Sequence, residues 1–451
     1  MNKSLGCLAG LLLGSGLVYA GWAMTPNSRY EPKVQELLKA CSDRERAQQK
    51  LATDVANNAY LDAAFLPYWG RKDLERKPDG QAEKKMKLVE KYSDLRDRKE
   101  TGLEMAVKAK DPTMEGAFSE FAAFYPKVHK VCNQTYFLAP QTEPLNYQTK
   151  MPAFLSLRAI CLDLATYSEY LTLTDKPDQA LEVAGDSLHL GWLIGSQPRG
   201  LMGQFMSMAL QSTGQGTLAM VLSNSPRLAS QASLEKLSQL LEATNPPDTA
   251  FPQALETEFY GACNSFSMLS GADTGGDALM VSGLTLPGLR ARELRLFKND
   301  VFPLVEQVRQ GQPVDTSWMQ ATGSGSWLLG RHSWVAKEFF PGLGESQRRF
   351  ALMQKRQAFL HLYVALALAA HKPGHWPSSL QELQAGGYKP LSKLNLSQID
   401  YQLKADQMEL KLTLKDDEAV EPRTAPGGSE MSEWEHLTYA TWTLHGPSLK
   451  P

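Results

Sequence analysis

Two histidines, His371 and His375, stand four residues apart, the spacing with which two imidazoles on one helix face bind zinc. Pro373 and Gly374 lie between them, and this pair should end a helix rather than continue it. No glutamate follows His371 directly, so the general base of a zinc peptidase is also missing. We expect a turn with two solvated imidazoles here, and the sequence predicts no metal centre.

A serine and a lysine three residues apart, Ser233 and Lys236, match the Ser-x-x-Lys element of penicillin-recognising hydrolases. That chemistry also needs Lys-Thr-Gly and Ser-Asp-Asn elements, and neither occurs in the sequence. A Gly-x-Ser-x-Gly elbow, a Walker loop and a dinucleotide-binding fingerprint are absent as well. Carboxylates are frequent, but spacing alone selects no acid–base pair among them. The sequence therefore assigns no catalytic residue and predicts no cofactor.

Four cysteines lie beyond the amino-terminal apolar segment, and they raise the question of a thiol nucleophile. They are Cys41, Cys132, Cys161 and Cys263. Cys132 or Cys161 could pair with His129 or His189, although nearness in sequence does not show contact, and we expect structural cysteines. No Cys-x-x-Cys pair occurs, which argues against a zinc ribbon and a thioredoxin-like motif. Disulfides, which an oxidising compartment permits, and buried free thiols are both open.

One predicted helix carries a stripe of methionine and phenylalanine side chains. Its members are Met202, Phe205, Met206 and Met208. Flexible thioether side chains fill irregular gaps in protein cores, so the pattern favours packing. A binding groove for an apolar ligand is the alternative.

The elements that must position these residues begin with an apolar segment. No charged residue occurs between Lys3 and Arg29, and Leu5–Met24 has the roughly 20 residues that a helix needs to cross a bilayer. The same region also resembles a signal peptide cleaved after Ala20. We expect a single-pass anchor in the inner membrane with the bulk of the chain in the periplasm. Cleavage after Ala20 would instead give a secreted or periplasmic protein.

Most of the remaining chain shows helical periodicity interrupted by proline or glycine. The predicted helices are Lys33–Leu66, Ala153–Leu173, Gln179–Ile194, Leu201–Leu222, Leu234–Leu241 and Arg290–Arg309. Helices joined by short turns are typical of a helical hairpin array. Asp175–Ala184 looks like the second half of a tetratricopeptide unit, but no second copy follows at a 34-residue period. A Gly/Ser-rich segment, Thr322–Ser326, suggests a linker.

The carboxyl-terminal part changes from helical periodicity to alternation. Gln347–His371 is predicted as a long helix and Ser378–Leu383 as a short one capped by Ser378 or Ser379. Alternating apolar residues then predict three strands. They fall at Ile399–Leu403, Met408–Leu414 and Leu437–Leu444. The predicted fold is therefore mainly α, with a helical hairpin array, a small C-terminal α+β unit and an N-terminal membrane or signal helix.

The turn that runs Gly-His-Trp-Pro-Ser-Ser-Leu over residues 374–380 resembles the region after the long helix in type II secretion pseudopilins. It is also similar to a segment of uncharacterised bacterial membrane-anchored proteins. The resemblance covers Gln347–Leu444, about a fifth of the chain. Pseudopilins carry a glutamate early in their apolar helix, and Leu5–Met24 contains none. The resemblance implies a bacterial exported protein and transfers no catalytic residue.

Four regions follow from these patterns: an anchor or signal peptide at 1–24, a charged helical region at 25–140, a helical core domain at 141–340 and the pseudopilin-like unit at 341–451. The net charge of −2 argues against nucleic acid as a partner. Without catalytic motifs, we expect a membrane-anchored scaffold or interaction protein of the bacterial envelope with an envelope protein as partner. The alternative is an exported envelope hydrolase, which requires a deep polar cleft with a carboxylate or histidine of shifted pKa.

Overall fold

The computed structural model describes residues 28–54, 56–61, 101–110, 112–138, 145–146, 149, 154–196, 200–268, 287–320, 332–340, 342–371, 374–389, 394–404, 407–414 and 441–449. Leu5–Met24 lies outside these residues, and so do both the membrane-anchor and the signal-peptide predictions. The predicted linker at Thr322–Ser326 also lies outside them. Among the helices that are described, none is long and apolar enough to cross a membrane.

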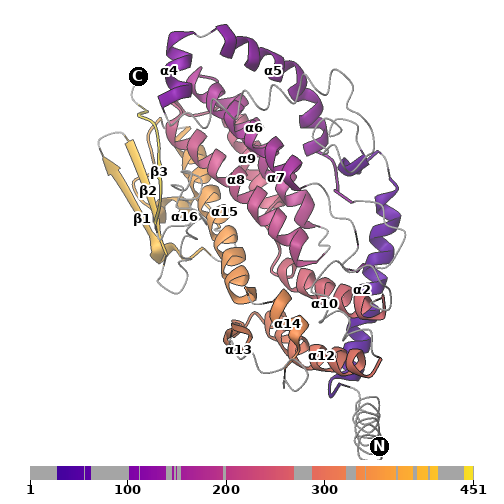
Figure 1. Ribbon diagram of the computed structural model, residues 1–451. Helices are drawn as coiled ribbons and strands as arrows, with labels where there is room; N and C mark the ends of the chain where they lie inside the picture. Colours follow the sequence, from indigo (N-terminus) through magenta and orange to yellow (C-terminus); the bar gives the residue numbers. More distant parts are fainter. Residues whose placement is uncertain are drawn as a thin grey trace, which may run out of the picture.

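The structure is mainly helical, with a small antiparallel sheet near the carboxyl terminus, which confirms the predicted fold class at this level (Figure 1). The α-helices are α2 (Glu31–Ala52), α4 (Thr101–Ala109), α5 (Pro112–Cys132), α6 (Phe154–Leu173), α7 (Pro177–Ser196), α8 (Leu201–Asn224), α9 (Gln231–Ala243), α10 (Ala250–Met268), α12 (Pro287–Arg309), α13 (Ser317–Gln320), α14 (Trp334–Phe339), α15 (Leu343–His371) and α16 (Leu380–Ala385). The strands are β1 (Ile399–Lys404), β2 (Gln407–Thr413) and β3 (Thr441–His445), in the order β1-β2-β3.

Helices α7 and α8 form the most tightly packed pair. A side chain on Gly191 of α7 would place its Cβ 2.6 Å from the backbone nitrogen of Gln211 on α8. On α8, a Cβ on Gly214 would lie 2.5 Å from the backbone nitrogen of Leu188. Only glycine permits such close approach of two helix backbones. Helix α8 has no charged residue among its 24 positions, in keeping with its place between α7, α6, α10 and α15.

Two hydrophobic cores meet along α15. The second half of α15 shares one core with α5 to α9 and with the buried face of the sheet, where Trp442 of β3 lies 5.7 Å from Phe359 between ring centroids. The first half of α15 contributes Phe350 and Met353 to a second core with α2, α10 and α12. In Figure 1 the sheet lies next to α15 at the left of the molecule, whereas α2 and α5 lie at the right. A single long helix therefore joins both cores.

Helix α2 is shorter than predicted, since it ends at Ala52 instead of continuing to Leu66. The side-chain amide of Asn58 donates to the carbonyl oxygens of Ala52 at 2.9 Å and Leu138 at 2.8 Å. The free carbonyl at the helix end is thereby satisfied by a side chain from the following turn. The partner Leu138 is 80 residues away in sequence, so local periodicity could not reveal this stop.

The other predicted helices are present with shifted ends, and the structure also contains helices that were not predicted. Helices α6, α7, α8, α9, α12, α15 and α16 correspond to predicted segments, and Ser379 caps α16 by accepting from the backbone of Glu382. Helices α5, α10, α13 and α14 were not predicted. Pro126 argues for a break inside α5, yet the helix continues through it with Pro126 exposed.

Candidate functional site

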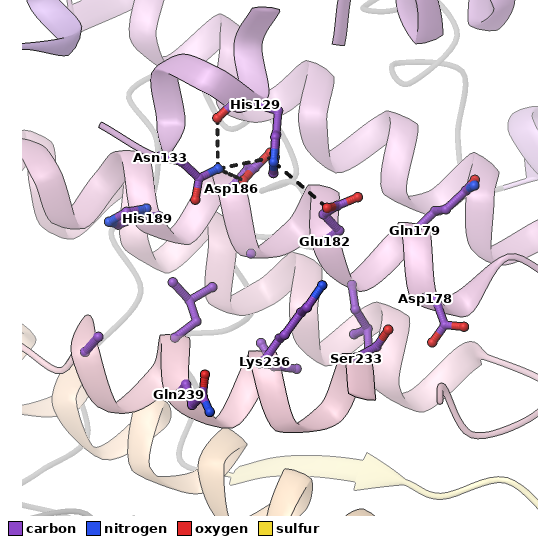
Figure 2. Close-up of a pocket in the computed structure, with 15 residues that line it drawn as sticks. His129, Asn133, Asp178, Gln179, Glu182, Asp186, His189, Ser233, Lys236 and Gln239 are labelled. Atoms are coloured by element: carbon purple, nitrogen blue, oxygen red, sulfur yellow. Dashed lines mark hydrogen bonds and ion pairs between the residues drawn. The ribbon is translucent and has the colours of Figure 1, made fainter. Parts of the chain in front are cut away.

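A cleft of about 600 Å³ with both polar and apolar lining lies between α5, α7 and α9 (Figure 2). Helix α7 forms the floor and one wall of the cleft, and α9 forms the opposite wall. The end of α5 lies against α7 and lines the rest of the cleft. The polar side chains of the cleft are His129, Asn133, Asp178, Gln179, Glu182, Asp186, His189, Ser233, Lys236 and Gln239. The volume falls in the range of about 300–1,000 Å³ that is usual for ligand sites.

The buried carboxylate of Asp186 is the centre of the cleft floor, with only 4% of the residue exposed. It accepts hydrogen bonds from the Tyr125 hydroxyl at 2.7 Å, from His129 Nδ1 at 2.8 Å and from Asn133 Nδ2 at 3.0 Å. All three donors belong to α5 or to the turn that follows it. A buried carboxylate is stable only with such partners, so Asp186 fixes the position of α5 on α7.

The imidazole of His129 lies between two carboxylates. Its Nδ1 contacts Asp186, and its Nε2 lies 4.0 Å from Glu182 Oε1. The hydrogen bond that His129 donates to Asp186 raises the pKa of His129, partial burial opposes this effect, and the charges of Asp186 and Glu182 add to the increase. The protonated imidazolium is therefore the favoured form over a wider pH range than in a free histidine.

The opposite wall is the amino-terminal half of α9. Ser230 caps this helix, and its backbone N–H donates to Asp178 Oδ1 at 2.7 Å. Burial alone would raise the pKa of Asp178, but hydrogen bonds from Ser230 and Ser233 outweigh it and lower the pKa. Lys236 forms no hydrogen bond or ion pair with the residues that the structure describes, and Figure 2 shows its side chain directed across the cleft toward α7.

His189 is the second histidine of the cleft. It stacks on Trp192 with 5.4 Å between ring centroids, and its Nδ1 is buried without a hydrogen-bond partner. Burial lowers the pKa of His189, against a smaller opposing effect of Asp186. Burial thus favours the neutral form of His189, whereas the pKa of His129 is shifted in the opposite direction.

No protein-family model, curated protein or solved structure gives a match to this chain. The chemistry of the cleft is therefore argued from its own residues.

The structure brings together four residues that belonged to separate sequence hypotheses, namely His129, His189, Ser233 and Lys236. The Ser-x-x-Lys spacing does place Ser233 and Lys236 on one face of α9. The Ser233 hydroxyl, however, accepts from the Ser230 hydroxyl at 3.1 Å, and no contact with Lys236 activates it among the described residues.

None of these four cysteines lines the cleft, and all four are free thiols. Cys132 and Cys161 are fully buried in the core beside α7. Burial raises the pKa of both thiols, to about 12 for Cys161. A thiol in this environment stays protonated and is a poor nucleophile, which agrees with the expected structural role.

The remaining candidates do not form a common site. His371 Nε2 contacts the carbonyl of Ala229 at 2.7 Å, whereas His375 Nδ1 contacts the carbonyl of Trp376 at 3.2 Å. No cluster of three metal-ligating side chains occurs within the described part of the chain.

The methionine stripe divides between three environments. Met206 is buried in the core that contains the sheet, Met208 is buried in the core that contains α2, and Met202 is 56% exposed. The stripe therefore serves packing on two sides of α8 and does not line one apolar groove.

Sequence reasoning missed the carboxylates of the cleft. Asp178, Glu182, Asp186 and His189 follow one another at intervals of four, four and three residues, which places them on one face of α7. A polar stripe along an otherwise apolar helix was the available signal. Asn133 could not be assigned in the same way, because α5 was not predicted.

Proposed function

We propose that this protein is a non-catalytic binding protein of the bacterial envelope, tethered through Leu5–Met24, whose α5/α7/α9 cleft receives a polar segment of a partner protein. The tether and the compartment rest on the apolar length of Leu5–Met24 and on the pseudopilin-like turn at 374–380. The binding role rests on the cleft.

One observation carries the choice of binding over catalysis. The Asp186 carboxylate already accepts from three donors, and its hydrogen bond with His129 raises the pKa of that imidazole and so favours the protonated form. An imidazolium donates hydrogen bonds but does not accept a proton, and Ser233 has its hydroxyl engaged by Ser230. The cleft thus presents fixed donors and acceptors, which suit recognition.

Site-specific photo-crosslinking in the native membrane tests this proposal. A photoreactive residue in place of Gln239, which lines the cleft, should give a discrete adduct with one envelope protein, and Lys236→Glu should abolish the adduct. The control position is Gln402, which is exposed on β1 and does not line the cleft, and which should give none. Equal adducts at both positions, or none at Gln239, would contradict the proposal.

A hydrolase is the second candidate, and the His129 geometry favours it. A carboxylate at Nδ1 and a ring Nε2 toward the cleft is the arrangement of an oriented general base. The hypothesis required a deep polar cleft with a carboxylate or histidine of shifted pKa, and the raised pKa of His129 beside the cleft supports it. It predicts a hydrolysis rate that rises with pH through the raised pKa of His129 and is lost in His129→Gln. A chain that hydrolyses nothing in envelope extract, with its cleft crosslinks intact, would exclude it.

A further inference from the structure

The two walls of the cleft each keep one charge that the protein itself does not neutralise. On the α7 side, Asp186 is matched by His129, which leaves the carboxylate of Glu182 with only a 4.0 Å contact and 53% of its side chain exposed. On the α9 side, Lys236 has no charged partner among the described residues. Asp178 is engaged with the first turn of α9 and does not compete for the ammonium.

We infer that the cleft binds an extended peptide segment carrying one basic and one acidic side chain, the basic one on Glu182 and the acidic one on Lys236. This inference rests on the proposed function and names the ligand class of the same site. Opposite charges on facing walls select a ligand of matching polarity and disfavour a ligand with two charges of one sign.

The amide side chains of the cleft favour a peptide over a small zwitterion. Gln179 on α7 and Gln239 on α9 line the cleft, and neither has a hydrogen bond to another described residue. A primary amide offers both a donor and an acceptor, which match the N–H and C=O groups of an extended backbone. A free amino acid would leave these amides without hydrogen-bond partners and would fill only part of the 600 Å³ volume.

Acetylated and amidated tetrapeptides supply the probe. We would titrate Lys-Ala-Ala-Glu, its reverse Glu-Ala-Ala-Lys and the neutral Gln-Ala-Ala-Gln, with the alanine spacer varied, into the full-length chain in detergent micelles. Partly exposed ion pairs contribute about 0.5–1 kcal/mol each, so one polarity should bind about five- to thirty-fold more tightly than the neutral peptide. Calorimetry or fluorescence anisotropy measures the dissociation constants.

Exchanging the charges of Glu182 and Lys236 tests whether these two residues set the preferred polarity of the peptide. Glu182→Lys or Lys236→Glu alone should each remove the preference over the neutral peptide, and the double exchange should restore binding with the opposite polarity preferred. Glu235→Lys is the matched control, because Glu235 is the exposed neighbour of Lys236 on α9 and does not line the cleft. This control should retain the wild-type preference.

The outcomes separate the inference from the proposed function. If charged and neutral peptides bind alike while the Gln239 crosslink to a partner persists, the inference is wrong and the proposed function stands. If the peptides do not bind and the crosslink is also absent, both fail. If free lysine or glutamate binds as tightly as the tetrapeptides, with the same dependence on Glu182 and Lys236, the peptide class is wrong.

Discussion

Replacing Asp186 by asparagine should release α5 from α7 without unfolding the helices beneath it. Asp186 accepts three hydrogen bonds, and bonds to a charged group contribute about 1.5–3 kcal/mol each. Asparagine keeps one acceptor oxygen, and the freed groups of His129 and Asn133 can reach water because both side chains are partly exposed. We therefore expect a local loss of about 2–3 kcal/mol, less than the sum of the three bonds.

Hydrogen exchange of the full-length chain measures this local stability. A loss of this size raises the open fraction of α5 about 30- to 150-fold, and its amides should exchange faster by that factor. The amides of α10 and α12 should not change, since they pack in the other core. The control is Glu182→Gln, whose carboxylate makes only a 4.0 Å contact and which should cost no more than about 0.5 kcal/mol.

The dependence on pH follows from His129, whose pKa is raised in the folded protein. Stability from such a group is fully present below its unfolded pKa, about 6.5, and is lost as pH rises through the folded pKa. After correction for intrinsic exchange rates, the difference between wild type and Asp186→Asn should thus be larger at acid than at alkaline pH. Unchanged exchange in α5, or a loss spread evenly over all helices, would refute the reasoning.

Three further substitutions or reagents test the packing of the fold. Gly191→Ala should lower the melting temperature by overpacking α7 against α8, at a cost of about 1–3 kcal/mol, whereas Gly116→Ala, with nothing within 4 Å, should leave it unchanged or higher. Glu256→Gln removes the buried partner of two arginines and should make α2 sensitive to protease, at a cost of about 2–4 kcal/mol. Cys161, whose pKa is raised to about 12 by burial, should react with iodoacetamide only after unfolding, as mass spectrometry would show.

Local signals were sufficient for the central helices of the fold. Apolar periodicity with Pro177 and the turn before it predicted α6 and α7. The serine pair at 378 and 379 predicted a cap for α16, and Ser379 is the residue that caps it. They failed where a distant partner decides the structure. The end of α2 depends on Asn58 binding Leu138, and the continuity of α5 through Pro126 depends on its packing on α6 and α7. Neither contact has a local pattern.

The candidate site could be predicted only in fragments. His129, Ser233 and Lys236 each attracted attention by residue type, but a single sequence does not show that α5 and α9 face the same side of α7. The polar face of α7 at Glu182 and Asp186 was visible as a stripe. Tertiary packing decides which helices lie opposite this polar stripe. Residue spacing within one helix cannot predict that arrangement.

The two sides of α7 explain why the cleft is a defined site. Gly191 brings one side so close to α8 that the two helices cannot slide past each other without backbone collision. The other side carries Glu182 and Asp186, so the packing of α7 on α8 also holds the backbone of these two residues in place. Helix α5 is held by the apolar side chains that it buries in the core and by Asp186, and the Asp186 contact weakens when His129 loses its proton. We therefore expect the α7 wall to be rigid and the α5 wall to be the adjustable one. In Asp186→Asn, ligand affinity should fall through disorder of α5, whereas Gly191→Ala should impair the whole fold.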